Sequence, residues 1–277
     1  MTHIRSSRRA ALAALAALSI TLHPFAAHAA GQKGGTAGGG AKTGAGNAPA
    51  AKKPALTRDQ IIAKLAGVPL FTFADEKGAP LTASGGNGKP VVGVFVDVAD
   101  AKTFESSLKK NNKTVAEKVK LVPISLGDVY KISETQKELT FAFVPSNKQL
   151  EAAQTLQKDD KKAFSGTPLF VARAGKDKGY LTVTQNNQTV VPLFFVKSDL
   201  DALVSRLKQN QPDLAKSVEI EAISLENVLG LMKVGDNPEL KRLEIVPPRT
   251  ALEYVRSLKP EGADGKKPVT AGPKKPS

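Results

Sequence analysis

The sequence predicts a mixed α/β fold built from two tandem, internally repeated units of about 100 residues in a pseudo-twofold arrangement. Two observations lead to this prediction: the chain matches itself at an offset of 99 residues, and each half alternates short apolar strand patterns with helical patterns. Along the 277 residues we expect a signal peptide over 1–29, a flexible linker over 30–56, repeat units over 57–157 and 158–258, and a basic tail over 259–277.

The self-match is clearest at two short motifs. Gly67–Phe71 (GVPLF) falls on Gly166–Phe170 (GTPLF), and the same register holds from residue 67 to residue 130 without a gap. Widening the offset to 102 brings Phe143–Pro145 onto Ile245–Pro247. Because one register spans strand and helix patterns alike, we interpret the two units as products of a duplication.

The first thirty residues have the features of an export signal. Arg5, Arg8 and Arg9 precede the thirteen-residue apolar run Ala10–Leu22, and the small-residue pattern Ala27–Ala29 follows it. A membrane anchor is the less favoured alternative, because thirteen residues are too few to span about 30 Å of hydrocarbon as a helix. We expect cleavage directly after this pattern, by either Sec or twin-arginine export.

The net charge of +14 is concentrated outside the expected folded region. Gly31–Pro54 and Lys259–Ser277 are rich in Gly, Pro and Lys, whereas residues 59–258 carry 27 basic and 24 acidic residues. A nucleic-acid-binding protein would concentrate basic residues on its folded surface, so we expect no nucleic-acid partner. The basic segments could contact anionic lipid headgroups at a membrane periphery. Solvated tethers are the favoured interpretation of them.

The first expected element is a helix. Thr57–Gln60 has the pattern of a capping box, and the helix would continue through Ile61, Ile62 and Leu65.

Each repeat unit then begins with three expected strands. They are Leu70–Ala74 and Leu169–Ala172, then strands beginning at Leu81-Thr82 and at Tyr180–Thr182, then Val91–Val96 and Val190–Val196. Turn residues at Gly85–Gly88 and Asn186-Asn187 separate the second strand from the third. The third strands are almost continuously apolar, which is typical of strands buried on both faces.

A helix follows the third strand in each unit. Asp100 and Asp199 are expected to cap or open it. Its apolar stripe is Leu200, Leu203, Val204 and Leu207 in the second unit, with Phe104 and Leu108 matching in the first. The remaining elements of each unit are a strand (Val119–Ile124; Val218–Ile223), a short helix, a last strand (Phe141–Pro145; Leu243–Pro247) and a closing helix (Leu150–Leu156; Leu252–Leu258).

The residues needed for most enzyme chemistries are missing. The chain has no Cys, and His3, His23 and His28 all lie in the expected signal peptide. Without thiol or imidazole, the processed chain has no Ser-His-Asp or Cys-His nucleophile, disulfide or His/Cys zinc site. We therefore expect a protein that is not an enzyme and that uses no cofactor or metal.

Two weaker catalytic or ligand signals have simpler explanations. The carboxylate pairs Asp97/Asp100 and Asp159/Asp160 fit helix starts and surface charge better than acid–base catalysis. Gly175–Gly179 (GKDKG) lies between two expected strands, so a hairpin turn is favoured over a phosphate loop, which would need a helix N-terminus.

Four motifs in this order resemble the Tic-twenty-two-like family. They are Leu65–Phe71 (LAGVPLF), Val119–Tyr130 (VKLVPISLGDVY), Phe141–Pro145 (FAFVP) and Gly166–Tyr180 (GTPLFVARAGKDKGY). The likeness covers residues 57–258, and the sequence departs from the family pattern in its Gly/Ala linker and lysine-rich tail. The family comprises exported proteins of cyanobacteria and a peripheral import component between the two chloroplast envelope membranes.

The resemblance implies a non-enzymatic, chaperone-like factor in protein transport and outer-membrane protein biogenesis. Its partners would be unfolded outer-membrane or precursor proteins and the soluble domains of an Omp85-type insertase. Its compartment would be the periplasm of a cyanobacterium-like cell, with the thylakoid lumen as a second location. The alternative is a structural adaptor that binds a folded translocon or insertase partner without holding clients.

A carrier of this kind needs apolar surface that unfolded chains can share. The candidate client-binding residues are phenylalanines of the expected strands: Phe71, Phe95, Phe141, Phe143, Phe170, Phe194 and Phe195. For any one of them, burial in the core is the favoured alternative. Because Phe194 and Phe195 are strand neighbours, they must face opposite sides, and one of the two would line a groove.

Overall fold

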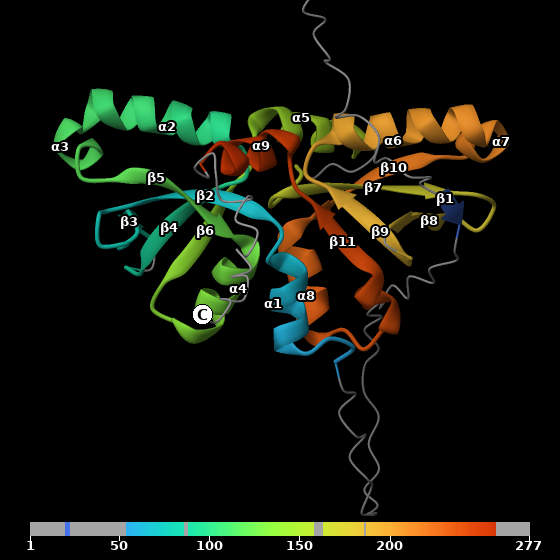
Figure 1. Cartoon of the computed structure of the whole chain (residues 1–277), viewed down its shortest axis with the longest axis horizontal. Helices are drawn as coiled ribbons and strands as arrows, with labels where there is room; N and C mark the ends of the chain where they lie inside the picture. The colour runs from blue at the N-terminus through green and yellow to red at the C-terminus, as the bar shows by residue number, and fades with distance from the viewer. Residues whose placement is uncertain (1–19, 23–53, 86–87, 158–162, 186, 259–277) are drawn as a thin grey trace, which may run out of the picture. The chain divides into compact units, whose positions relative to one another are not determined.

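The computed structural model describes residues 20–22, 54–85, 88–157, 163–185 and 187–258 (Figure 1). Within these residues the chain is a mixed α/β protein with two β-sheets and nine α-helices, which confirms the mixed α/β part of the prediction. The predicted tail, the signal peptide apart from Ile20–Leu22, and the linker before residue 54 lie outside the described residues. None of the helices in the described ranges is long and apolar enough to cross a membrane.

The chain divides into two compact units, each assembled from two separate stretches. The β2 unit consists of Pro69–Val144 and Pro247–Ser277, and the β7 unit consists of Met1–Val68 and Pro145–Val246. These boundaries differ from those of the sequence repeats, which we placed at 57–157 and 158–258. The difference arises because the first helix of the first repeat and the last helix of each repeat belong to the unit formed by the other repeat.

The sheet of the β2 unit has five strands. They are β2 (Pro69–Ala74), β3 (Thr82–Ser84), β4 (Pro90–Phe95), β5 (Lys120–Ser125) and β6 (Thr140–Val144). The order is β3-β4-β2-β5, and β6 also pairs with β4. All pairs are antiparallel except β4 with β6, which are parallel.

The sheet of the β7 unit has the same set of strands and one more. Its strands are β7 (Pro168–Ala174), β8 (Gly179–Gln185), β9 (Gln188–Phe194), β10 (Glu219–Ser224), β11 (Leu243–Val246) and β1 (Ile20–Leu22). The order is β1-β8-β7-β9-β11, with β10 beside β7 and further pairing between β8 and β9. Only β9 and β11 run parallel.

Strand registers in the two sheets correspond residue by residue. Phe71 lies opposite Phe95 in the first sheet, and Phe170 lies opposite Phe194 in the second. The β2–β5 and β7–β10 ladders differ by the same 99 positions. In the parallel ladders, β4 and β9 are related by an offset of 99 residues, whereas β6 and β11 are related by an offset of 102 residues. Both offsets are those found in the sequence.

Helices cover both faces of the first sheet (Figure 1). Helices α2 (Val98–Asn111), α3 (Lys113–Ala116) and α9 (Arg249–Ser257) lie on one face, and α4 (Leu126–Thr135) lies on the other. Under α2 and α9, Phe71, Phe73 and Phe95 form a core cluster with Ala101 of α2 and Ala251 of α9. Both alanines are fully buried. Helix α9 is therefore part of this core.

The second sheet is also covered on both faces (Figure 1). Helices α5 (Asn147–Leu156), α6 (Lys197–Asn210) and α7 (Pro212–Ala215) lie on one face, and α1 (Arg58–Leu65) and α8 (Leu225–Val234) lie on the other. A short 3₁₀ helix, η1 (Pro238–Arg242), precedes β11. Ala153 of α5 is fully buried beside Phe170, Leu181 and Leu203. Helix α5 thus completes this core, as α9 completes the other.

The helix starts confirm the predicted capping box and, for Asp100 and Asp199, agree with helix opening and not with capping. Thr57 and Gln60 form the predicted capping box of α1, with both reciprocal hydrogen bonds present. Asp100 and Asp199 lie in the first turns of α2 and α6 but do not cap them. The N-cap of α2 is Asp97, whose carboxylate accepts from the Ala99 amide at 2.8 Å. An extended residue directly before the first turn is where a side chain reaches the free amides.

The GKDKG segment forms the predicted turn. It joins β7 to β8, and the Lys178 amide donates to the Gly175 carbonyl at 3.2 Å. Gly175 and Lys178 both have positive φ, at 78° and 48°. The segment connects two antiparallel strands and precedes no helix, so it lacks the N-terminal amides that bind phosphate.

Candidate client-binding surfaces

The described residues contain no group of three or more His, Cys, Asp or Glu side chains that could hold a metal ion. Of the carboxylate pairs considered from the sequence, Asp97 serves as a helix cap and Asp159/Asp160 lie outside the described residues.

Four of the seven candidate phenylalanines lie in the cores. Phe71, Phe95, Phe170 and Phe195 are buried, and none can touch a client while its core stays closed. The other three, Phe141, Phe143 and Phe194, are partly exposed. These three remain candidates for client contact.

The structure distinguishes Phe194 from Phe195. Phe195 is only 2% exposed, whereas Phe194 is partly exposed and packs on the α6 side of its sheet, against the cluster that contains Phe170. Of the two neighbours, Phe194 is therefore the one that surface contacts can reach.

Three rings of the β2 unit form an aromatic patch, defined as Phe73, Phe95 and Phe104. The Phe104 ring centroid lies 5.3 Å from that of Phe73 and 5.2 Å from that of Phe95, and the last two are 5.9 Å apart. Phe104 projects from α2 and is 38% exposed, whereas Phe73 and Phe95 are buried beneath it. The patch thus exposes one ring supported by two others.

The same position in the β7 unit is built differently. At an offset of 99, Phe73 corresponds to Ala172 and Phe104 to Leu203, which is 6% exposed. Within the described residues, an exposed ring at this helix position therefore occurs in the β2 unit and not in the β7 unit. The sequence had placed Phe104 in an inward helix stripe and did not single it out as a contact residue.

A second exposed apolar surface lies on α8 of the β7 unit. We call Leu231 and Val234 the α8 ridge; they are 55% and 69% exposed. On the opposite side of α8, Leu225, Val228 and Met232 are buried. The ridge could have been found in the sequence, because LENVLGLMKV has more apolar residues than a single buried stripe requires.

A polar cluster on the second sheet has a structural role. Arg173 donates from Nε to Glu221 at 2.7 Å and from Nη2 to the Tyr180 hydroxyl at 2.6 Å. Burial alone would lower the pKa of Arg173, but the bonds with Glu221 and Tyr180 outweigh it and raise that pKa. Burial, assisted by Glu221, also raises the pKa of Tyr180. The cluster joins β7, β8 and β10 and leaves the guanidinium charged.

Glu226 ties the start of α8 to the start of β7. Its carboxylate accepts from the Thr167 amide and from the Thr167 hydroxyl, both at 2.9 Å. Thr167 is almost fully buried, and its carbonyl accepts from the Leu225 amide. Because these buried polar groups are hydrogen-bonded to one another, we assign the cluster a role in stability and not in catalysis or ligand binding.

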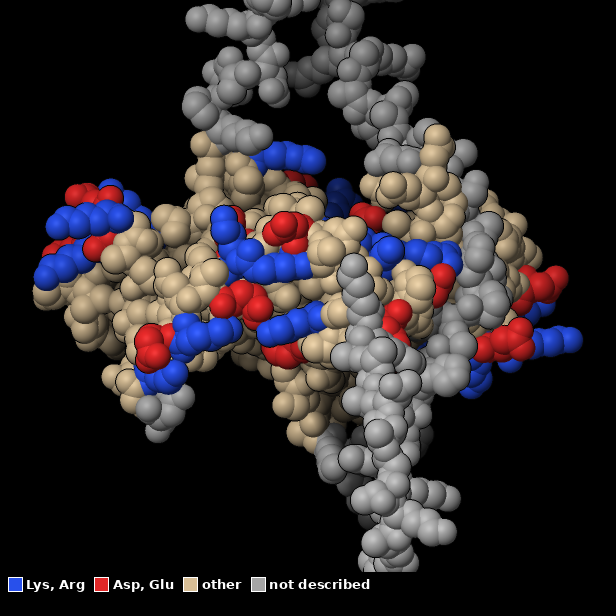
Figure 2. Space-filling model, turned by 90° about the horizontal axis from the view of Figure 1, so that it is seen from below, with Lys and Arg blue, Asp and Glu red and all other residues tan. Residues whose placement is uncertain are grey.

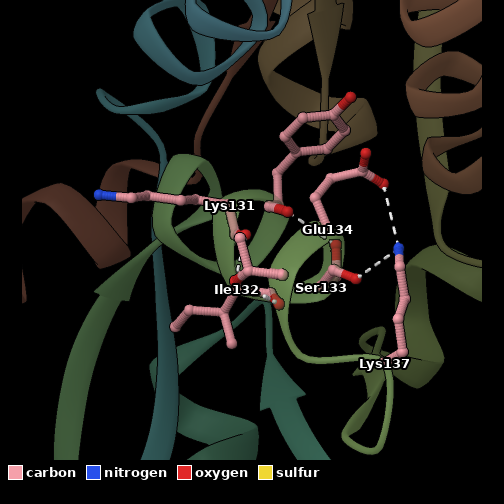
Figure 3. A network of polar contacts seen from close by, with 7 residues as sticks. Lys131, Ile132, Ser133, Glu134 and Lys137 are labelled. Carbon is pink, nitrogen blue, oxygen red and sulfur yellow. Dashed lines mark hydrogen bonds and ion pairs between the residues drawn. The ribbon is translucent and has the colours of Figure 1, made fainter.

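A third polar network closes the C-terminal end of α4 (Figure 3). Lys137 donates to the Ser133 carbonyl at 3.3 Å and pairs with the Glu134 carboxylate at 3.9 Å. A cation at the end of a helix satisfies free carbonyls and stabilises the helix dipole. This network is a helix cap.

Charges on the described surface are mixed in sign. On the face drawn in Figure 2, Lys and Arg side chains lie beside Asp and Glu side chains. Among the described residues, several charged side chains make ion pairs within one helix, such as Lys109 with Glu105 at 2.7 Å and Lys197 with Asp201 at 2.8 Å. On the face drawn, the described residues thus form no extended surface of one sign for a polyanion.

The Tic22-like family model matches residues 2–256. The chain belongs to the Tic22-like family. The resemblance carried by the four sequence motifs is thereby confirmed.

Relatives in plants share about a quarter of the aligned residues. Protein TIC 22, chloroplastic, of Pisum sativum is 26% identical over 195 residues, covering 70% of this chain and 74% of the pea protein. Protein TIC 22-like, chloroplastic, of Arabidopsis thaliana is 24% identical over 201 residues, covering 70% of this chain and 62% of the Arabidopsis protein.

Two solved Tic22 structures share the fold. Anabaena Tic22, described as a protein of protein transport, superposes with a TM-score of 0.63 at 26% identity, covering 74% of this chain and 98% of that one. Tic22 from Plasmodium falciparum gives a TM-score of 0.58 at 20% identity, covering 72% and 96%. The first likeness agrees with the family membership, and the second concerns the fold alone.

Proposed function

We propose that this Tic22-like protein is an exported, non-enzymatic carrier that holds unfolded precursor or outer-membrane proteins in the periplasm. The signal-like first thirty residues support export, and the protein-transport description of Anabaena Tic22 supports the process. The insertase that would receive such clients is of the Omp85 type, through its soluble domains.

The observation that carries the proposal is the exposed ring of Phe104 over Phe73 and Phe95. Because two buried rings hold the Phe104 ring in place, the carrier loses little side-chain conformational entropy when a client covers that ring. Burial is worth about 25 cal/mol per Å², so a contact of a few hundred Å² gives weak and reversible capture. Weak capture suits a carrier that must release its client.

The repeated architecture supports a second part of the proposal. Equivalent ladders at offsets of 99 and 102 favour an origin by duplication, with one surface on each unit: the aromatic patch and the surface at Phe194. An extended client that contacts both surfaces is held more tightly than by either alone, because the second contact is intramolecular.

The test measures how long an unfolded outer-membrane protein stays free of aggregates, followed by light scattering. We expect the wild-type chain to delay aggregation and Phe104→Glu to lose most of the delay, because a carboxylate would have to be desolvated to make the same contact. Ser106→Glu is the matched control: it adds the same charge to an exposed polar position of α2 and should behave as wild type. Equal activity of the two variants would contradict the proposed contact.

The adaptor alternative predicts a different result. A chain that delays no aggregation but binds the folded soluble domains of an Omp85-type protein in a titration would be an adaptor. Client holding with normal activity at Ser106→Glu and loss at Phe104→Glu would exclude a purely adaptor role.

A further inference from the structure

The outer edge of β8 carries a strand from the far N-terminus of the chain. Residues Ile20–Leu22 form β1 and pair antiparallel with β8, with Ile20 opposite Val183, Thr21 opposite Thr182 and Leu22 opposite Leu181. These three residues end the apolar run that the sequence predicts to be removed with the signal peptide. After that cleavage, the edge of β8 would lose its only partner on this side within the described residues.

β8 is an unusual edge strand. It is seven residues long (GYLTVTQ) and contains no Pro, Lys, Arg, Asp or Glu. Leu181 and Val183 belong to the core cluster of the β7 unit, so their side chains fix the position of β8 in the sheet. Proteins usually blunt their edges with charge, Pro or short length, because an open edge pairs with other chains. β8 uses none of these devices.

The corresponding edge of the β2 unit is blunted. β3 has three residues (TAS), all exposed, and pairs only with β4 within the described residues. The opposite edges of both sheets are protected as well. β5 contains Pro123, which has no amide to donate, and β10 carries Glu219 and Glu221. Within the described residues β6 (TFAFV) and β11 (LEIV) also have one partner strand each; β11 carries Glu244, and β6 has five residues against seven in β8. β8 is therefore the longest of these edges without charge or Pro, and a strand lies on it.

We propose that the β8 edge at Leu181–Val183 is a strand-addition site for an extended apolar segment of a client polypeptide, bound antiparallel in the place that β1 occupies. This inference rests on the proposed carrier function and adds a second mode of contact to it. Main-chain hydrogen bonds give such binding its affinity with little dependence on sequence. Segments of alternating apolar residues, which form the strands of membrane β-barrels, match the mode.

β1 shows which chemistry the edge accepts. Its sequence is Ile-Thr-Leu, an alternation of apolar and polar residues without charge. In the precursor the protein's own leader occupies the edge, and in the processed protein a client would replace it. The inference thus predicts competition between the leader strand and a client segment.

The test uses disulfide trapping, in which no native thiol competes because the chain has no Cys. Thr182→Cys is introduced into the full chain together with Thr21→Pro, which removes an amide from β1 and frees the edge. The probe is a peptide of residues 18–24 in which Cys replaces Thr21. Residues opposite each other on antiparallel strands have Cβ atoms about 4.5–5.5 Å apart, and disulfides form near the lower end of that range.

The matched control is Thr82→Cys in β3, which has the same residue type at the corresponding strand position and is more exposed than Thr182. We expect the peptide to trap Thr182→Cys about tenfold more than Thr82→Cys, and to lose this preference when Thr21 of the chain is left intact. A second arm needs no peptide: Thr21→Cys with Thr182→Cys should close an internal disulfide in the full chain.

Three results would overturn the inference. They are equal trapping at Thr82→Cys, disulfide-linked dimers of the Thr182→Cys chain in preference to the peptide, or absence of the internal disulfide. An aggregation assay separates the inference from the proposed function. If the peptide-trapped chain delays aggregation as well as the untrapped chain, the β8 edge holds no client but the carrier function stands. If neither chain delays aggregation, the proposed carrier function is wrong. The trapping result still shows whether the β8 edge accepts a strand.

Discussion

The ring of Tyr254 packs edge-on against the ring of Phe71, with centroids 5.4 Å apart and planes at 77°. Phe71 lies in β2, among the first strands of the folded region, and Tyr254 lies in α9, its last helix. The Lys102 ammonium group of α2 lies 4.9 Å from the Tyr254 ring. One aromatic side chain near the C-terminus thus connects β2 and α2 of the same unit.

We expect Tyr254→Ala to destabilise the protein by about 1–3 kcal/mol, because it removes an edge-to-face ring pair and the apolar area of a partly buried ring. Tyr254→Phe keeps the ring and should stay within about 0.5 kcal/mol of wild type. Urea unfolding followed by circular dichroism measures both. A loss of similar size in the two variants would show that the hydroxyl group, and not the ring, makes the important contact.

The motif glycines Gly67 and Gly166 are expected to respond differently to Ala. Gly166 has a φ of +92°, and a Cβ there would lie 2.5 Å from Oε2 of Glu226 and 3.0 Å from Cβ of Ser224. Gly67 has no atom within 4 Å of such a Cβ. Gly166→Ala should therefore cost about 1–3 kcal/mol, whereas Gly67→Ala should change the stability by less than about 1 kcal/mol. Denaturation midpoints of the two variants provide the comparison, and equal values would contradict it.

Tyr180 should make the folded state sensitive to alkali. Burial raises its pKa above the ordinary value of 10.0, so the folded state holds the phenolic proton more tightly than the unfolded state does. The resulting stability is present below pH 10 and is lost as the pH rises through the folded-state pKa. Tyr180→Phe should thus lose less stability than wild type between about pH 9 and pH 11. Urea midpoints across this range test the difference, and parallel curves would refute it.

Client holding should be insensitive to salt. Residues 59–258 carry 27 basic and 24 acidic residues, and their charges are interspersed, so electrostatic capture by the folded region is weak. At about 0.5 M salt the Debye length is about 4 Å, yet apolar contact persists. The delay of aggregation should be the same at low and high salt. A delay that disappears with salt would assign the binding to the lysine-rich segments and not to Phe104.

The equivalence of strands in the two units was accessible from the sequence, because the offsets of 99 and 102 residues relate ladders as well as residues. Pairing of Phe71 with Phe95 and of Phe170 with Phe194 reproduces the 99-residue offset in three dimensions. Burial of individual phenylalanines was less accessible. Strands covered by helices on both faces have no solvent side, so alternation along the strand does not separate core residues from surface residues.

The exchange of α5 and α9 between the units was not predictable from periodicity. Ala153 and Ala251 each mark the buried stripe of an amphipathic helix, and such a stripe indicates that a helix packs on a sheet without indicating which one. The same limit applies to β1. An apolar run with a small-residue pattern after it fits a leader, and nothing in it points to β8 as a partner.

The exchange of α5 and α9 also determines the order in which the two hydrophobic cores can be completed during synthesis. The sheet of the β2 unit is synthesised first but lacks α9 until residues Arg249–Ser257 are available. A chain beginning at the second repeat would lack α1 and α5, which belong to the β7 unit. Neither repeat therefore contains every helix of one unit, and we expect the core of the β2 unit to be completed last, once residues Arg249–Ser257 become available.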